Sequence, residues 1–317
     1  MGSKQCLVFA FMILCLTPNP AIDRTLLLPR LQPGESHRAR RAIVAAGGKG
    51  LNVARAVQIL GGRPLVMGLL GGHSGRLLAD LTAADGLAAR WTATDGETRT
   101  SVIVVPEAGE ATVINEPGPA LTAADWSRFV DDVVTQAQQA EVVCLCGSLP
   151  RDVPANAVAD LIQGVAATGR PLWVDSSGQW LRHAISARPT GLKVNNAEAG
   201  DVLDTMIDTP EAAIVAAGRL RGRGVRMVAI TLGRQGAVLV DEANAYYARP
   251  PQVISVSNVG SGDCFLAGLL TASIAGHPPA QALRWAVAAG TANTLAPGGG
   301  RFTWADFQRI LAQVVLS

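Results

Sequence analysis

The chain has 317 residues, and its 27 Lys and Arg residues are nearly balanced by 25 Asp and Glu residues, leaving a formal net charge of +2. This balance, with no basic block, argues against a nucleic-acid partner. Apolar residues make up 49% of the chain but aromatic residues only 4%, which is more typical of a helix-and-parallel-sheet protein than of an all-β protein. The length suits one large α/β domain or two ordinary ones.

The N-terminus carries an apolar run from Cys6 to Leu16, after a single Lys4. This run resembles the core of a signal peptide, but it is too short to span a bilayer, and no small-residue cleavage site follows it. The alternative is a buried parallel strand near residues 13–16. The five cysteines include Cys144 and Cys146 but no paired CxxC, so zinc and a disulfide framework are poorly supported. We therefore expect a reduced cytoplasmic protein with no membrane segment.

Four β runs occur without helices between the members of each pair. Residues 22–30 and 37–45 form the first pair, and residues 99–105 and 110–115 form a hairpin around Glu107-Ala108-Gly109. We expect a small sheet that projects from the main domain. Asp23 ends the Pro-rich stretch that begins at Thr17, and an isolated Asp there is usually turn chemistry.

A glycine run, Gly47-Gly48-Lys49-Gly50, opens a helix predicted from Lys49 to Leu60. The Walker A pattern fails because Leu51 stands where Ser or Thr is required, and the dinucleotide GxGxxG pattern fails at Val53. A Lys at a helix N-terminus is unfavourable for the helix dipole, so a bound anion would rationalise Lys49.

From residue 121 the pattern alternates between helix and strand, as in a parallel sheet, and small polar residues follow the strand ends. Right-handed crossovers would place these ends on one rim, where ligands bind. We see no linker or repeat. The predicted helices are 122–138, 154–168, 179–187, 196–206, 211–222, 263–275, 279–295 and 303–316, and the predicted strands are 141–146, 171–174, 193–195, 225–231, 237–240, 244–248 and 252–256.

The stretch Gly260-Ser261-Gly262-Asp263 joins the last β run to a long apolar helix. Glycines at such a junction let the backbone approach a ligand closely, and the N–H groups of the first helical turn favour an anion. A carboxylate repels a bound phosphate, so a carboxylate at this position requires an explanation. Asp263 either complements the helix dipole or accepts a proton during phosphoryl transfer, and these residues alone leave both open.

Gly260-Ser261-Gly262-Asp263 resembles the GAGD signature of the ribokinase-like (PfkB) sugar kinases, and residues 47–54 resemble their GGKGxNVA signature, about 200 residues earlier in the family's order. The resemblance implies a single α/β ribokinase-like domain over residues 12–317, with a central mostly parallel sheet flanked by helices. The strands at about 22–45 and 99–115 would form a lid over the sugar. Because family chains often begin with a pattern that matches from Met12, residues 1–11 would be an N-terminal extension.

The resemblance also assigns the reaction centre and the sugar site. Asp263 would be the base, and the backbone of Gly260, Ser261 and Gly262 would hold the transferred phosphoryl group. Three cations, Arg38, Lys49 and Arg99, imply a substrate that already carries a phosphate. The predicted substrate-binding residues are Asp23, Arg38, Gly47, Gly48, Lys49, Asn52, Arg99 and Ser148.

On the nucleotide side, residues 193–198 resemble the family's KPNxxE motif with Val in place of Pro. Of the two possible registers, we choose Asn195 with Glu198 over Asn196, and Glu198 would order the water shell of Mg²⁺. Residues 231–236 resemble the family's (S/T)LGxxG nucleotide loop. The helix over 279–295 would form one side of the adenine-binding site. The predicted nucleotide-binding residues are Asn195, Glu198, Thr231, Gly233, Gly236 and Asn293.

The resemblance is nearest to the branch of 1-phosphofructokinase, 6-phosphofructokinase and tagatose-6-phosphate kinase. It implies an ATP- and Mg²⁺-dependent kinase of a ketohexose monophosphate, and a homodimer joined through the lid. Whether the kinase also needs a monovalent cation is left open. Thr100-Ser101 departs from the branch pattern, which puts the identity of the substrate in doubt. The alternatives are a kinase of an unphosphorylated sugar or nucleoside, and a catalytically silent nucleotide-binding regulator. The carboxylate of Asp263 argues against the regulator, because binding alone gains nothing from it.

Overall fold

The computed structural model describes residues 11–107 and 110–317. The first ten residues of the expected N-terminal extension, and Ala108 and Gly109 of the expected hairpin turn, lie outside the described residues.

Within the described residues, a central sheet has ten strands in the order β14-β13-β12-β11-β10-β9-β8-β1-β4-β5. The run from β11 to β5 is parallel, and β12, β13 and β14 are added antiparallel. A parallel run places all its carboxyl ends on one rim, as the alternating sequence pattern predicts. The strands are β1 (Met12–Leu16), β4 (Arg63–Leu70), β5 (Ala88–Ala93), β8 (Val142–Cys146), β9 (Leu172–Asp175), β10 (Gly191–Asn195), β11 (Met227–Thr231), β12 (Ala237–Val240), β13 (Ala245–Arg249) and β14 (Val315–Leu316).

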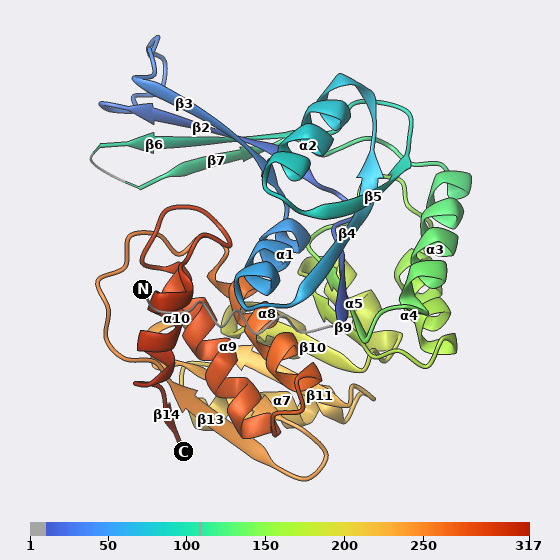
Figure 1. The fold of residues 1–317 in the computed structure, drawn as a ribbon, viewed down its shortest axis with the longest axis vertical. Helices are drawn as coiled ribbons and strands as arrows, with labels where there is room; N and C mark the ends of the chain where they lie inside the picture. Colours follow the sequence, from blue (N-terminus) through green and yellow to red (C-terminus); the bar gives the residue numbers. More distant parts are fainter. Residues whose placement is uncertain (1–10, 108–109) are drawn as a thin grey trace, which may run out of the picture.

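Helices cover both faces of this sheet and create two buried apolar clusters (Figure 1). Strand β1 shows the reason: Ile13 and Cys15 belong to one cluster and Leu14 and Leu16 to the other, because successive strand side chains alternate. One face packs against α1 (Lys49–Ile59), α2 (Gly72–Ala84), α8 (Ser261–Ile274), α9 (Pro279–Asn293) and α10 (Trp304–Leu311). The other packs against α3 (Ala123–Ala137), α4 (Ala157–Ala167), α5 (Gly178–Ser186), α6 (Asn196–Leu203) and α7 (Pro210–Arg221).

A second, four-stranded sheet has the order β3-β2-β6-β7 and projects from the main body (Figure 1). It consists of β2 (Ala21–Leu28), β3 (Arg41–Gly47), β6 (Thr100–Pro106) and β7 (Thr112–Asn115). The four predicted strands are confirmed, with ends shifted by a few residues. The expected turn at Asp23 is wrong, because this residue lies inside β2, opposite Ala45 of β3 and Ser101 of β6. We call this sheet the lid sheet.

Two predictions near the C-terminus are wrong. The run 252–256 forms no strand: Pro250 and Pro251 supply no backbone donors, and β14 already pairs with β13. The last helix ends at Leu311 instead of 316, because the final apolar residues pair with the edge of β13. Residues 61–98, for which no element is predicted above, hold β4, α2 and β5.

Candidate functional site

The turn that begins α8 has two glycines at close approaches, one to backbone and one to a lysine side chain. Gly260 has φ 76°, and a Cβ there would lie 2.4 Å from Cα of Gly299. A Cβ at Gly262 would lie 2.6 Å from Nζ of Lys193. Both close approaches leave the first turn of α8 tightly enclosed. Asp263 follows in that turn, with only 5% of its surface exposed.

Two lysines converge on a second buried carboxylate, that of Asp175 at the end of β9. Nζ of Lys49 donates to Oδ1 of Asp175 at 2.7 Å, and Nζ of Lys193 donates to Oδ2 at 2.9 Å. Burial alone would raise the pKa of Asp175, but Lys193 and Lys49 lower it to about 2. In turn, burial would lower the pKa of Lys49, but Asp175 and Asp263 raise it above its usual value. Asp175 therefore stays ionised and Lys49 stays charged.

Asp263 has the opposite electrostatic balance. Burial, followed by the charge of Asp175, raises its pKa to about 6, although Lys49, Lys193 and a hydrogen bond from Asn52 act against this shift. Nδ2 of Asn52 donates to Oδ2 of Asp263 at 2.8 Å. Two nearby carboxylates whose environments drive their pKa values apart are the arrangement expected of a proton acceptor beside a permanently charged group.

The lid sheet brings another carboxylate to this rim. Asp23 packs over Gly47, where a Cβ would lie 2.2 Å from Cγ of Asp23. Burial raises the pKa of Asp23 to about 6, against the charges of Arg99 and Arg55. Nε of Arg99 donates to the backbone oxygen of Asn19 at 3.2 Å.

Asn19 links several predicted sugar-side residues and was not predicted itself. Its Nδ2 donates to Oγ of Ser148 at 3.2 Å and to the carbonyl of Leu149 at 3.3 Å. Its Oδ1 is buried and has no hydrogen-bond partner.

The predicted Gly48, with φ 133°, opens α1 beside Thr17.

The three predicted cations have different surroundings. Lys49 is bonded to Asp175, Arg99 lies beside Asp23, and Arg38 is exposed in the loop between β2 and β3. Lys49 therefore lies beside the two buried carboxylates Asp175 and Asp263, and its predicted role in binding the sugar's phosphate, shared with Arg38 and Arg99, stays a prediction.

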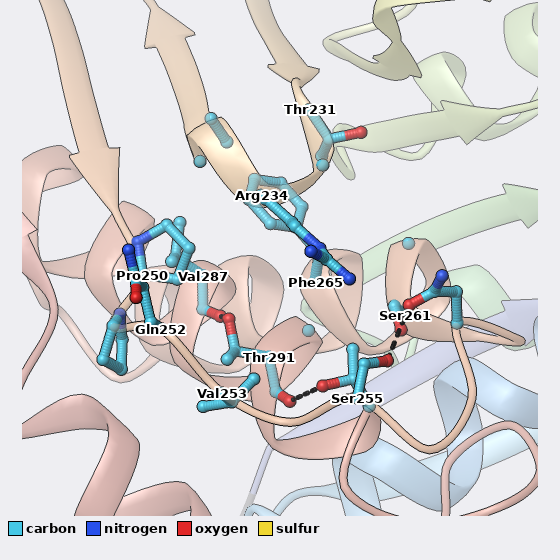
Figure 2. Close-up of a pocket in the computed structure, with 18 residues that line it drawn as sticks. Thr231, Arg234, Pro250, Gln252, Val253, Ser255, Ser261, Phe265, Val287 and Thr291 are labelled. Carbon is cyan, nitrogen blue, oxygen red and sulfur yellow. Dashed lines mark hydrogen bonds between the residues drawn. The ribbon is translucent and has the colours of Figure 1, made fainter.

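A cavity of about 640 Å³ opens beside the α8 turn. Thr231, Gly233, Gly236, Ser261 and Gly262 are among the residues that line it. Figure 2 shows Thr231 and Ser261 among its lining side chains. The predicted nucleotide loop and the predicted phosphoryl-holding turn thus share one space. The side chain of Arg234 lies between Thr231 and Ser261 in Figure 2.

The other predicted nucleotide-side residues do not line this cavity. Asn195 and Glu198 form a capping box on α6, in which Oε2 of Glu198 accepts from the backbone N of Asn195 at 2.9 Å. The side chain of Asn196 is directed to the carbonyl of Ile207 at 3.0 Å. The charge of Glu198 still reaches the centre, since it contributes to the raised pKa of Lys49.

Asn293 differs most from its predicted role. It is fully buried, and its Nδ2 donates to the carbonyl of Val259 at 2.8 Å while its Oδ1 accepts from the backbone N of Gly300 at 2.9 Å. Helix α9 does line the cavity, but through Val287, Gly290 and Thr291. Asn293 instead links the loop before α8 to the loop after α9, and its Nδ2 also lies 3.4 Å from Oγ of cavity-lining Ser261.

Sequence reasoning did not single out Asp175 or Lys193 as site residues. The available signals were weak: Asp175 ends a strand before Ser176-Ser177, and Lys193 begins the motif that contains Asn195. Among residues 11–107 and 110–317, no group of three or more His, Cys, Asp or Glu side chains is arranged to hold a metal ion. Nor does any helix in this part of the chain have the length and apolarity needed to cross a membrane.

The pfkB family carbohydrate kinase model matches residues 16–305. The chain belongs to this family. It is an ATP-dependent sugar-phosphate kinase with the ribokinase-like fold, and the resemblance read from the sequence motifs is confirmed.

Relatives of this pfkB-family chain are similar over most of their length. The 1-phosphofructokinase of Rhodobacter capsulatus is 38% identical over 272 residues, covering 85% of this chain and 86% of the relative. The 1-phosphofructokinase of Haloferax volcanii is 35% identical, covering 87% and 88%. The phosphofructokinase-2 of Escherichia coli in complex with fructose-6-phosphate superposes with a TM-score of 0.87 at 29% identity, covering 96% of this chain and 99% of that one.

The two carboxylates with pKa values of about 6 give a prediction for pH. Activity that needs Asp263 and Asp23 ionised is present above this pKa and is lost as the pH falls through it. We expect kcat/KM to fall near pH 6 with a limiting slope near two. The measurement is the pH dependence of kcat/KM for wild type and Asp23→Asn at saturating ATP. The variant should lose about one unit of slope relative to wild type, and an equal slope in both proteins would contradict the assignment of Asp23. The substrate's own phosphate titrates in both and cancels in this comparison.

Proposed function

We propose that this kinase transfers the γ-phosphoryl group of ATP to the free primary hydroxyl of a ketohexose monophosphate, giving the bisphosphate. The candidates are fructose 1-phosphate, fructose 6-phosphate and tagatose 6-phosphate. The observation that carries the proposal is the position of Asp263. This buried carboxylate has a pKa of about 6, follows cavity-lining Gly262, and is bonded to Asn52 of the helix that the lid strand β3 leads into.

Fructose 1-phosphate is the first candidate, because relatives with 34–38% identity are named 1-phosphofructokinase. Fructose 6-phosphate is the second, because the similar Escherichia coli phosphofructokinase-2 was solved in complex with it. A coupled assay of ADP release tests the proposal against the three phosphosugars and the free sugars. Higher kcat/KM for a free sugar than for every phosphosugar would overturn it.

In this mechanism Asp263 accepts the proton of the attacking hydroxyl. The first-turn N–H groups of α8 hold the transferred phosphoryl group, although that of Ser261 already donates to the carbonyl of Asn258 at 3.3 Å. Lys49 and Lys193 place two positive charges beside the reacting groups, and Asp175 keeps both fixed. Asp175 does not compete as a base, because its pKa of about 2 makes it a weak proton acceptor.

On the sugar side, Asp23 would accept a hydrogen bond from a sugar hydroxyl, while Gly47 and Gly48 would leave room for the sugar ring. Asn52 and Ser148 would add hydrogen bonds, and Arg99 with Arg38 would bind the phosphate that the sugar already carries. On the nucleotide side, Thr231, Gly233 and Gly236 would hold ATP in the cavity, with α9 as its wall.

Mg²⁺ would enter with ATP and neutralise the developing charge on the phosphates. Mg²⁺ usually keeps several waters and takes few protein ligands, which fits a centre without a preformed set of three ligands among the described residues. Glu198 would hold its water shell, with Asn195 fixing the position of Glu198. The Escherichia coli phosphofructokinase-2 was also solved in complex with potassium, so the assay should compare K⁺ with Na⁺.

Removing the proposed base gives the first test of the mechanism. We expect Asp263→Asn to lower kcat by at least about 100-fold, the scale of a lost proton acceptor. The affinity for ATP should stay within a few-fold or become tighter, because the substitution removes a negative charge near the phosphates. Steady-state kinetics with ATP titration measures both quantities. Near-normal turnover would refute the base assignment.

Arg99→Ala tests whether the substrate carries a phosphate. Truncating one side of a partly buried charge pair costs about 2–5 kcal/mol, which corresponds to roughly 30-fold to several thousand-fold in kcat/KM for the phosphosugar. The KM for ATP should change little. Arg24→Ala is the matched control, because Arg24 is an exposed arginine on the same strand as Asp23. A loss under about threefold in Arg99→Ala would contradict the phosphate role.

The lid sheet is also the surface on which we place a homodimer. Large apolar side chains are exposed on its two outer strands: Ile43 and Val44 on β3 are 39% and 36% exposed, and Val113 and Ile114 on β7 are 53% and 59% exposed. Ile43 and Val113 lie in one cross-strand row with Ile103. Exposed apolar patches of this kind often mark protein interfaces. One relative, the Escherichia coli phosphofructokinase-2, was solved as a tetrameric inhibited form.

We therefore expect the mass of a dimer at micromolar concentration, because pairing two lid sheets would cover these side chains. Multi-angle light scattering measures the mass, and Val113→Lys should shift it toward the monomer. Arg76→Glu on α2, outside the lid sheet, serves as the charge control. A fully active wild-type monomer at this concentration would refute the lid interface.

A further inference from the structure

Arg55 is a buried arginine in α1 that the mechanism above does not use. Only 6% of its surface is exposed, and its guanidinium group has three separate acceptors. Nε donates to Oδ2 of Asp85 at 2.7 Å, one terminal nitrogen donates to Oδ1 of Asn52 at 3.0 Å, and the other donates to the carbonyl of Ala46. These acceptors belong to the end of α2, to α1 itself and to the lid strand β3.

The contact with Asn52 decides how that amide is oriented. A guanidinium group can only donate, so it must face the oxygen of the amide and not the nitrogen. The amide nitrogen is then left for Oδ2 of Asp263, at 2.8 Å. The other side of the amide is closed by Gly299, where a Cβ would lie 2.4 Å from Cγ of Asn52. Asn52 is therefore held in a single orientation from two sides.

The contact with Ala46 connects the same guanidinium group to the lid sheet. Ala46 pairs with Ile22 in β2, one position from Asp23, and the next residue, Gly47, supports the Asp23 carboxylate. Arg55 also acts on the pKa of Asp23 through its charge. The guanidinium group of Arg55 thus contacts both the lid strand β3, at Ala46, and the amide of Asn52, which is hydrogen-bonded to Asp263.

We propose that Arg55 is a positioning residue that orients Asn52 toward Asp263 and fixes this pair to the lid strand β3. The proposal rests on the proposed role of Asp263 as the base. The competing explanation is a purely structural ion pair between Arg55 and Asp85. That explanation predicts a loss of stability without a specific effect on the chemical step.

The test compares Arg55→Lys with Arg301→Ala. A lysine keeps the charge but cannot reach all three acceptors, so we expect kcat to fall about 10- to 100-fold, the scale of a small misplacement in an active site. The KM for ATP should change less than about threefold. Arg301 is the matched control, because its side chain also binds Asp85, at 3.0 Å, but among the described residues it donates no hydrogen bond to Asn52. Arg301→Ala should keep kcat within about twofold.

Two further readouts separate positioning from stability. In an Asn52→Ala background, adding Arg55→Lys should lower kcat by less than about twofold, because Arg55 would have no amide left to orient. The acid limb of kcat should also move to higher pH in Arg55→Lys, since losing the Asn52 hydrogen bond raises the pKa of Asp263. The other groups that face Asp263 stay in place: Lys49, Lys193, Asp175 and the neutral thiols Cys146 and Cys264.

Multiplying effects in the double variant, or an unmoved acid limb with a lowered Tm, would overturn the proposal. If Arg55→Lys does not fold, Asp85→Asn replaces it as the milder variant, with an expected loss of about 3- to 10-fold and the same direction of the pH shift. Asp85→Asn without either effect would also overturn the proposal. If Asp263→Asn retains turnover, the base assignment itself fails. If Asp263→Asn loses turnover but Arg55→Lys does not, only the positioning role fails.

Discussion

Two carboxylates buried on the same rim are the constraint on which the rest of this site depends. Asp175 and Asp263 repel one another, and burial penalises the charge of both. Lys49 and Lys193 bond only to Asp175 of this pair, so the balance is unequal: Asp175 remains ionised while the pKa of Asp263 rises to about 6. The four side chains come from α1, β9, β10 and α8, and only the parallel sheet brings these elements together.

Lys49 shows how the fold resolves a local conflict. Helix α1 has no acidic residue in its first turn, and a lysine there opposes the helix dipole. The sequence suggested a bound anion as compensation. In the structure the compensating anion is the carboxylate of Asp175, at 2.7 Å, so the protein supplies the negative charge itself. This ion pair fixes the position of the ammonium group, which would reduce the ordering needed in the proposed reaction.

Sequence reasoning could predict what depends on local backbone chemistry. The glycine-opened helices, the alternating pattern and the lid strands were predicted from residues near one another in the chain. The Asn195–Glu198 pair was taken from the family resemblance, and in the structure it forms the capping box of α6. The Lys49–Asp175 contact joins residues 126 positions apart, and no local pattern encodes it. The hydrogen bonds of Asn293 could not be predicted for the same reason: its partners, Val259 and Gly300, lie on loops whose approach depends on tertiary packing.

The same distinction explains why the reaction class is easier to infer than the substrate. The residues proposed to carry the chemistry lie on elements of the sheet rim, where backbone contacts such as Gly260 against Gly299 leave little freedom. The substrate, in contrast, would be selected by the lid sheet, in which Arg38 lies on an exposed loop and Arg99 has only backbone acceptors. The residues proposed to recognise the sugar are therefore less constrained than Lys49, Lys193 and Asp263, which the charge and hydrogen bonds of buried neighbours hold in place.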